Sequence, residues 1–342
     1  MASAVETSAM RRALLLAATP DVPLGPNPRV GCVLLDEAGN PVAEGFHRGA
    51  GTAHAEIVAL DAAGERARRA TAVVTLEPCT HTGRTGPCAQ ALLDAGVSRV
   101  VFATPDPNPV AAGGSRLLRQ AGVDVEGGLL ADEAQALNEE WSLAVAHGRP
   151  FVTWKTAATL DGRVAAADGT SRWITSPQSR ADVHDWRARC DAVMVGTGTV
   201  LADDPQLTAR GTTARPVLTQ PLRVVVGTRD IPASARVLDD AAPTLHLRTH
   251  DPREALESLV DRGVQHVYLE GGPTLAGAFV ARGLVDRVVA YYAPRLLGSG
   301  AMALGSAGVG TLADAPRLAV RDVTTIGPDV RVIATRHPRG QE

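Results

Sequence analysis

Short apolar runs alternate with amphipathic stretches along the whole chain. Three runs in the first half, at 30–36, 71–76 and 99–103, are rich in β-branched residues, as buried strands are. Helical patterns are found near 54–67, 88–95, 113–121 and 131–146. Strands that alternate with helices in this way predict a mostly parallel sheet with helices on both faces.

The clearest break in this pattern is the sequence HGRP, where Gly148 is followed two residues later by Pro150. A glycine and then a proline after a helical stretch are typical of a helix stop. We therefore expect one domain over 1–147 and a second over 148–342. The second half alternates again, with strands expected in FVTWKTAATLDG and near 191–196, 222–227, 243–248, 265–269 and 286–292. Helices are expected near 177–189, 253–261 and 273–281, and a long exposed loop over 208–221.

Composition favours a globular protein without affinity for polyanions. Hydrophobic residues make up 45% of the 342 residues, and the formal net charge is -3. That charge gives no electrostatic argument for binding nucleic acid or an anionic membrane. The apolar stretches are far shorter than the roughly 20 residues of a membrane span. The run ALLLAA near the start is shorter than a signal-peptide core of roughly 7–15 residues, so we expect a cytoplasmic protein.

The chain has four cysteines, too few for a disulfide framework in a protein of this length. Cys32 and Cys190 stand alone in apolar surroundings and are expected to be buried packing residues. Cys79 and Cys88 are closer together, and three roles are open for them: a disulfide, a metal site or ordinary core. In a reducing cytosol, paired cysteines indicate a metal or catalysis more often than a disulfide.

The sequence around these two cysteines favours a metal. His54 opens a helical stretch, and Glu56 follows two residues later. Cys79 follows a strand and a proline, and Cys88 opens the next helix, where the helix dipole favours a thiolate and lowers the pKa. One imidazole and two thiolates leave a fourth tetrahedral position open, which is typical of a catalytic zinc site.

This set of residues predicts hydrolytic deamination. Zinc lowers the pKa of a bound water toward about 7, and a nearby carboxylate is needed to move protons to the departing ammonia. Glu56 is placed for that role. H-x-E together with P-C-x-x-C is a nucleobase-deaminase signature. Here eight residues separate Cys79 from Cys88, so the spacing differs from that signature.

The insert THTGRTGP between the cysteines, with PNPRVGCVL and DPNPVAAGG nearby, resembles the bifunctional deaminase–reductase family of riboflavin biosynthesis. DPNPVAAGG departs slightly from the family between DPNP and the glycines. The resemblance implies an α/β protein with an N-terminal cytidine-deaminase-like three-layer domain and a C-terminal dihydrofolate-reductase-like domain. It also implies zinc ligands at His54, Cys79 and Cys88, with Glu56 shuttling protons. Pyrimidine and phosphate contacts are implied for Asn27, His81, Arg84, Asp106 and Asn108.

Taken alone, the smaller motifs have simpler interpretations. His81 and DPNP are compatible with plain turns, and Arg84 is compatible with a solvated side chain. Arg84 lies between glycine-containing turns near the predicted metal, and guanidinium suits phosphate oxygens, which favours a phosphate contact.

The second half contains two glycine-rich turns that follow predicted strands, in VGTGTVLADDPQLTAR and VYLEGGPTLAGAFV. Bare backbone N–H groups at such a helix start suit the pyrophosphate of a cofactor, although a Gly-Gly turn is often only a turn. The motif is not G-x-G-x-x-G, which argues against an ordinary Rossmann domain. These turns, with TWKTAATLDGRVA and GTSRWITS, are similar to the reductase half of the same family. Thr159 stands where that family usually has serine.

The resemblance implies residues for the second site as well. NADPH contacts are implied for Ala158, Trp173, Thr199, Asp203, Thr228, Gly271, Gly272, Pro273 and Thr274. Substrate contacts are implied for Ser171, Arg187, Leu207, Arg210 and Glu270. Arg187 and Arg210 are then the expected phosphate clamps. From charge alone, Arg229 is placed to meet the extra phosphate of the cofactor.

Lys155 is the only lysine in the chain. It lies in a predicted strand just before the loop AATLDG, and lysine is a proton donor whose pKa falls on burial. We hypothesise that Lys155 polarises or protonates the sugar during reduction. The alternative is an ordinary surface lysine at a strand end.

The leading hypothesis is an enzyme with two active sites that act in sequence on one small pyrimidine phosphate. It would use one Zn²⁺ per chain for deamination and NADPH for reduction, and we expect a homo-oligomer. Alternatives are a single-activity deaminase with a degenerate second domain, a nucleic-acid deaminase and a zinc-stabilised binding protein. Only 3% of residues are aromatic, which argues against a single-strand binder. Glu56 argues against a purely structural metal site.

Overall fold

The computed structural model describes residues 1–20, 22, 25–81, 86–211, 217 and 219–336. The chain divides into two compact units, Met1–Gly148 and Arg149–Glu342. The division lies at the helix stop used above to set the domain boundary. Within the described residues, no helix is both long enough and apolar enough to cross a membrane.

The first unit is built on a sheet with the strand order β2-β1-β3-β4-β5. Its strands are β1 (Gly31–Leu35), β2 (Pro41–Phe46), β3 (Thr71–Leu76), β4 (Arg99–Thr104) and β5 (Asp124–Gly127). β3, β4 and β5 run parallel, whereas β1 is antiparallel to both β2 and β3. The expected parallel sheet is therefore found from β3 to β5, and a hairpin completes it.

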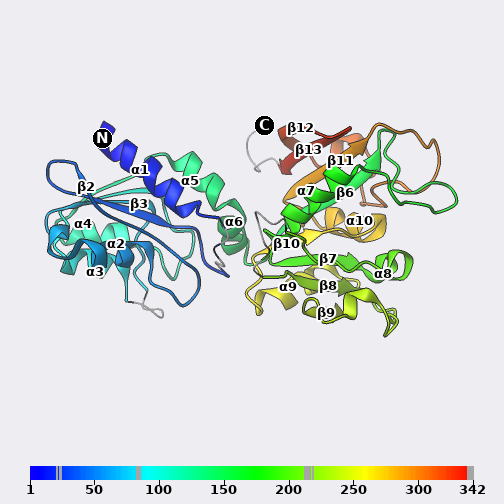
Figure 1. Cartoon of the computed structure of the whole chain (residues 1–342), viewed down its shortest axis with the longest axis horizontal. Helices are drawn as coiled ribbons and strands as arrows, with labels where there is room; N and C mark the ends of the chain where they lie inside the picture. Colours follow the sequence, from blue (N-terminus) through cyan, green and yellow to red (C-terminus); the bar gives the residue numbers. More distant parts are fainter. Residues whose placement is uncertain (21, 23–24, 82–85, 212–216, 218, 337–342) are drawn as a thin grey trace. The chain divides into compact units, whose positions relative to one another are not determined.

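Helices cover both faces of this sheet, as predicted. Figure 1 shows α1 (Ala4–Ala17) and α5 (Ala131–Leu137) on one face, and α2 (Ala55–Ala63), α3 (Cys88–Asp94) and α4 (Gly114–Gln120) on the other. A separate apolar core lies under each group of helices. Apolar residues of β1, β3 and β4 alternate between the two cores, and strand periodicity produces that alternation.

The predicted helix over 131–146 is two helices instead. α5 ends at Leu137, and α6 (Glu139–His147) begins two residues later. Asn138 between them exchanges two hydrogen bonds, each of 2.8 Å, with the backbone N–H and carbonyl of Arg29. The buried side chain of Asn138 therefore ends α5 by bonding to a residue that is distant in the sequence. Hydrophobic periodicity is a local pattern and does not predict such a contact.

The second unit is built on a sheet of eight strands in the order β12-β13-β11-β6-β10-β7-β8-β9. The strands from β11 to β9 in this order run parallel, whereas β12 and β13 are antiparallel. The parallel strands are β6 (Phe151–Thr159), β7 (Ala192–Gly196), β8 (Leu222–Val226), β9 (Thr244–Leu247), β10 (His266–Leu269) and β11 (Arg287–Ala293). The predicted strands of the second half are all present.

Helices again lie on both faces of the sheet. α9 (Pro252–Val260) and α10 (Pro273–Ala281) contribute to one apolar core, and α7 (Pro177–Arg187) and α8 (Thr197–Asp203) to another. Pro252 and Pro273 each occupy the first helical position, where the missing N–H costs nothing.

Three features of this unit were not predicted. α8 follows β7 directly. Because α8 contains Gly198, the sequence there suggests only a glycine-rich turn and not a helix. β12 (Leu318–Ile326) and β13 (Asp329–Arg336) form a hairpin at one edge of the sheet. The segment 208–221 has no helix or strand among its described residues, but Thr208 and Ala209 are buried, so its beginning is not exposed.

Candidate active sites

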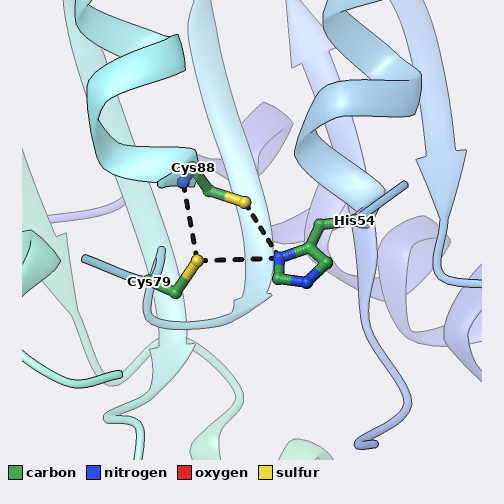
Figure 2. Close-up of side chains that lie close together, drawn as sticks. All are labelled: His54, Cys79 and Cys88. Carbon is green, nitrogen blue, oxygen red and sulfur yellow. Dashed lines mark hydrogen bonds between the residues drawn. The ribbon is translucent and has the colours of Figure 1, made fainter. Parts of the chain in front are cut away.

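His54, Cys79 and Cys88 come together in the first unit, as the sequence predicts. Figure 2 shows the imidazole of His54 directed toward both sulfur atoms. Nδ1 of His54 lies 3.2 Å from Sγ of Cys88 and 3.6 Å from Sγ of Cys79. One ligand atom from each residue lies within 4.8 Å of the others. This donor set of one nitrogen and two sulfurs fits a tetrahedral zinc with one open position.

Local structure places each ligand. His54 is the N-cap of α2, and Cys88 is the first residue of α3. Cys79 lies three residues beyond β3, and its backbone carbonyl accepts a hydrogen bond of 3.1 Å from the N–H of Ala89. The N–H of Cys88 points at Sγ of Cys79 over 3.5 Å. A strand end and two helix starts therefore converge on one point.

The two thiols differ in acidity. Hydrogen bonding from Cys88, and the nearby His54, lower the pKa of the Cys79 thiol to about 4 despite its burial. The neighbouring Cys79 thiolate, burial and the Glu56 carboxylate raise the pKa of Cys88. The Cys79 and Cys88 side chains hydrogen-bond to each other, so the second thiol and His54 together stabilise one thiolate in this pair. A lowered pKa of Cys88 itself stays a prediction. None of the four cysteines is in a disulfide, and all four are buried, as expected for Cys32 and Cys190.

Glu56 is the second residue of α2, the helix that begins directly after His54. Its side chain is buried, and burial raises the pKa of this carboxyl to about 7. Glu56 interacts with the Cys88 side chain and with the charges of His54 and Cys79, so it lies beside the ligand atoms without belonging to the cluster of three.

Asn27 is linked to this site by His47, a residue that the sequence analysis did not single out. Its Nδ2 atom lies 2.9 Å from Nε2 of His47, and Nδ1 of His47 lies 3.1 Å from the carbonyl oxygen of Ala53. A carbonyl only accepts, so Nδ1 of His47 donates to it and Nε2 accepts from Asn27. Burial lowers the pKa of His47, consistent with this neutral tautomer. The His47 ring packs edge-on against His54, with centroids 5.4 Å apart.

The predicted pyrimidine contacts His81, Asp106 and Asn108 are grouped near the ligands. The His81 and His54 ring centroids are 6.3 Å apart, and Nδ1 of His81 is buried without a partner among the described residues. Burial, with the charge of Cys79, raises the pKa of Asp106 to about 6. The Asp106 carboxylate accepts a hydrogen bond of 2.8 Å from the N–H of Asn108. Arg84 lies outside the described residues.

Glu77 was also missed. Its buried carboxylate accepts hydrogen bonds from the N–H of Asp106, at 3.3 Å, and from the N–H of Ser115, at 2.9 Å. It thereby fixes the loop that carries Asp106 against the end of β3. The only signal in the sequence is a charged residue directly after an apolar strand.

In the second unit, the two glycine-rich turns come together at the carboxyl ends of β7 and β10. Gly196 is the N-cap of α8 and Gly272 is the N-cap of α10. A Cβ atom on Gly272 would lie 3.7 Å from Oγ1 of Thr199, and one on Gly271 would lie 2.8 Å from the Leu275 side chain. Glycine at 271 thus avoids a close contact with the Leu275 side chain, and Gly272 caps α10, where the N–H groups of a helix start suit a cofactor pyrophosphate.

Lys155, Arg187 and Glu270 form a charged cluster beside these turns. Arg187 donates from Nε and Nη2 to the two carboxylate oxygens of Glu270, over 2.5 and 2.8 Å. Its Nη1 atom donates to the carbonyl of Thr208 over 3.0 Å. Burial lowers the pKa of Lys155, and the charge of Arg187 adds to that effect, whereas Glu270 opposes it. Lys155 is therefore a half-buried member of this cluster and not a fully exposed surface lysine.

The other predicted contacts of this unit are more dispersed. Ala158 and Leu207 are buried, Ser171, Thr199 and Asp203 are half-buried, and Trp173, Thr228, Arg210 and Thr274 are exposed. The guanidinium carbon of Arg180 lies 4.4 Å from the centroid of the Trp173 ring. Arg229 reaches the start of α8, because a Cβ atom on Gly198 would lie 3.0 Å from its Nη2 atom.

His184 is a further residue that the sequence did not single out. It lies one turn before Arg187 on α7. Burial and the charges of Arg187 and Arg210 lower the pKa of His184 to about 4. The sequence could have indicated His184 through its spacing from Arg187, because residues three apart share one face of a helix.

Two family models match the chain. Residues 4–104 match the cytidine and deoxycytidylate deaminase zinc-binding region, and residues 150–332 match the RibD C-terminal domain. Fold and sites therefore define a two-domain α/β enzyme, with a cytidine-deaminase-like zinc domain followed by a dihydrofolate-reductase-like domain.

Curated relatives and solved structures cover both domains. The chain is 50% identical to the riboflavin biosynthesis protein RibD of Mycobacterium tuberculosis, over 89% of this chain and 90% of that protein. It is 42% identical to RibD of Escherichia coli, over 94% of this chain and 96% of that protein. A structure of Acinetobacter baumannii RibD superposes with a TM-score of 0.88 at 39% identity, covering 98% of this chain and 99% of that one.

The Thermotoga maritima structure described as a diaminohydroxyphosphoribosylaminopyrimidine deaminase/5-amino-6-(5-phosphoribosylamino)uracil reductase gives a TM-score of 0.86. It is 32% identical and covers 97% of this chain and 99% of that one. The chain belongs to the RibD family. It is a bifunctional enzyme of riboflavin biosynthesis, a zinc-dependent deaminase and an NADPH-dependent reductase, and a single-activity deaminase is not favoured.

Proposed function

We propose that this enzyme deaminates 2,5-diamino-6-(5-phosphoribosylamino)pyrimidin-4-one and then reduces the ribosyl group of the product to a ribityl chain. The proposal assigns deamination to residues 1–147 and reduction to residues 148–342. The observation that supports it most directly is the convergence of the His54 nitrogen and the two cysteine sulfurs within 4.8 Å, with the buried Glu56 beside them.

In the deaminase site, His54, Cys79 and Cys88 would hold the zinc. Bound zinc supplies Lewis-acid activation of water. In the overall reaction, a carbon–oxygen bond to water forms at the ring carbon that carries the amino group, the carbon–nitrogen bond breaks and ammonia leaves. Of the two water protons, one goes to the amino nitrogen and one to the ring nitrogen. Glu56, the second residue of the helix capped by His54, would carry the proton to the amino nitrogen.

The remaining side chains of the first unit bind and orient the pyrimidine and its phosphate. Asn27, held by His47, and Asp106, held by Glu77, present fixed polar groups near the ligand atoms. His81 adds a buried nitrogen without a partner among the described residues. Arg84 is proposed as the phosphate contact, on the residues around it in the sequence alone.

In the reductase site, the turns at 196–199 and 271–274 would hold NADPH, with Ala158, Trp173, Asp203 and Thr228 as further contacts. NADPH supplies the hydride. Ser171, Leu207, Arg210 and the Arg187–Glu270 pair would bind the substrate. Because three donors of Arg187 are already occupied, Arg210 is the freer of the two predicted phosphate clamps. Lys155 is proposed to deliver the proton that accompanies hydride transfer to the sugar.

The two reactions can be separated by the product masses. Purified full-length protein with the pyrimidine substrate alone should replace one amino group by a carbonyl. Adding NADPH should then add one hydride and one proton. A metal assay of the same sample should show one zinc per chain. If the first mass appears without the second, the reductase assignment fails; if neither appears with zinc bound, the deaminase assignment fails.

We also propose that the enzyme is a cytoplasmic homo-oligomer. Four cysteines outside any disulfide and the use of NADPH suit a reducing compartment. β12 is an edge strand whose Leu318, Val320 and Val323 are exposed by 41%, 62% and 62%. Exposed apolar edge strands are usually covered by a partner. A V320K/V323K variant should have a smaller mass by light scattering than the parent; two equal masses would remove this proposal.

A further inference from the structure

Arg223 is a charged side chain that no step above uses, and it is fully buried. It is the second residue of β8, and its side chain has an exposed fraction of 0%. A buried guanidinium is costly unless its N–H groups are paired. The partners of Arg223 therefore show what the residue holds in place.

Those partners come from two loops at one end of the second sheet. Nη1 donates to the Asp239 carboxylate over 2.7 Å and to the carbonyls of Gln206 and Arg236, each over 3.3 Å. Nη2 donates to the carbonyls of Asp239 and Ala242. One guanidinium thus joins the segment 236–242 to the loop that begins after α8.

The loop after α8 has a strained backbone that needs such support. Asp204 and Leu207 are not glycines, yet their φ angles are 41° and 58°. Left-handed conformations in such residues persist only where neighbouring contacts enforce them. Gln206, between them, is bonded through its carbonyl to Arg223 and through its Nε2 atom to Asp239, over 2.8 Å.

The far end of the same loop is held as well. Gln220 exchanges two hydrogen bonds of 2.9 Å each with the N–H and carbonyl of Ala209. The carbonyl of Thr208 accepts from Nη1 of Arg187, which is paired with Glu270. The loop 204–209 therefore spans from the pair of the buried Arg223 with the exposed Asp239 to the Arg187–Glu270 pair.

We propose that Arg223, together with Asp239, is a positioning residue of the reductase site. It fixes the carbonyl of Gln206, which sets the backbone of Leu207 and, through Thr208, the orientation of Arg187. Arg223 itself does not contact the substrate. This inference rests on the proposed function, in which Leu207, Arg187 and Arg210 bind the pyrimidine phosphate.

The deaminase activity of the same chain is an internal control for testing this role. R223M should raise the reductase KM for 5-amino-6-(5-phosphoribosylamino)uracil by about tenfold or more, because small misplacements of binding groups have large kinetic effects. The KM for NADPH and the deaminase rate should stay at the values of the parent. R223K keeps the charge but not the planar fork, and it should restore only part of the loss.

D239N provides the same test with a smaller change. Asn keeps an oxygen for Arg223 but loses the charge, so we expect a smaller rise in the same KM. R282M is the matched control, because the exposed Arg282–Asp251 pair lies in the same unit. Parent-like substrate KM in folded R223M and D239N would overturn the proposal. So would equal rises in the KM values for substrate and NADPH, or loss of NADPH binding in both variants.

An R210M variant separates this inference from the assignment on which it rests. If R210M leaves the substrate KM unchanged while R223M raises it, the loop is positioned as proposed but Arg210 is not a contact. If R210M raises the KM and R223M does not, the contact stands and the positioning role fails.

Discussion

Arg187 and Glu270 form a bidentate ion pair across 83 residues of sequence, with N–O distances of 2.5 and 2.8 Å. Their side chains are only 14% and 10% exposed. Removing one partner of a buried pair leaves an uncompensated charge. We therefore expect E270A to lower the free energy of unfolding of the second unit by about 3–5 kcal/mol.

An apolar replacement of both partners should be less harmful. We expect R187M/E270L to recover most of the stability lost in E270A, because the buried Arg187 charge is removed together with its partner and only the half-buried Lys155 stays charged. Reductase activity should stay low in both variants, whereas deamination should persist. The measurement is a double-mutant cycle from denaturant titrations, together with both activities. Additive losses of stability would contradict the pairing.

The position of Glu56 predicts a selective loss of one activity. E56Q should reduce deamination by about 10²–10⁴-fold, the usual contribution of a general acid–base group. Zinc content should stay the same, because Glu56 is not in the ligand cluster. Reduction of supplied deaminated intermediate should also be unchanged. Full deamination by zinc-loaded E56Q would refute the proton-shuttle role.

The three ligand atoms predict a dependence on metal that is confined to one site. Chelation, or the substitution C79S, should abolish deamination and zinc binding while leaving NADPH oxidation with the intermediate intact. C190A is the control, because Cys190 is a buried cysteine of the other unit. Retention of one zinc per chain by C79S, measured by elemental analysis, would show that the ligand set is different.

The half-buried position of Lys155, beside Glu270 and Arg187, predicts that a positive charge there is not enough for reduction and that a transferable proton is needed. Arginine keeps the charge but does not give up a proton at neutral pH. K155R and K155M should therefore both lower the reductase kcat by about 10²-fold or more. Both should bind NADPH normally in a fluorescence titration. Unaltered turnover of K155R would remove the proposed proton transfer.

The lowered pKa of His184 predicts a loss of stability in mild acid. The folded pKa is about 4, below the ordinary value near 6.5, so the unfolded chain binds a proton that the folded chain does not. Stability should therefore be complete above about pH 6.5 and fall as the pH decreases toward about 4. The H184Q variant should show a weaker fall over this window.

Denaturant titrations at several pH values measure this effect. Tryptophan fluorescence reports mainly on the second unit, because Trp154, Trp173 and Trp186 lie in it and Trp141 does not. The same pH dependence in H184Q and the parent would mean that other groups cause it.

The sequence by itself determined the chemistry of the first site. The ligands and Glu56 lie within a few residues of a strand end and two helix starts, so local structure fixes most of their geometry. The glycine-rich turns at 196–199 and 271–274 could also be predicted from the sequence, because each follows an apolar strand directly. The alternating pattern also predicted most of the strands and helices in their order along the chain, although not β5, α8 or the hairpin β12–β13.

Only the tertiary structure decided which distant side chains meet. Leu269 of β10 pairs with Trp154 of β6 and with Met194 of β7, and this register brings Glu270 to Lys155 and Arg187. The same packing buries Arg223 and occupies the donors of Arg187. Such contacts join residues tens of positions apart, and sheet register, not local propensity, sets them.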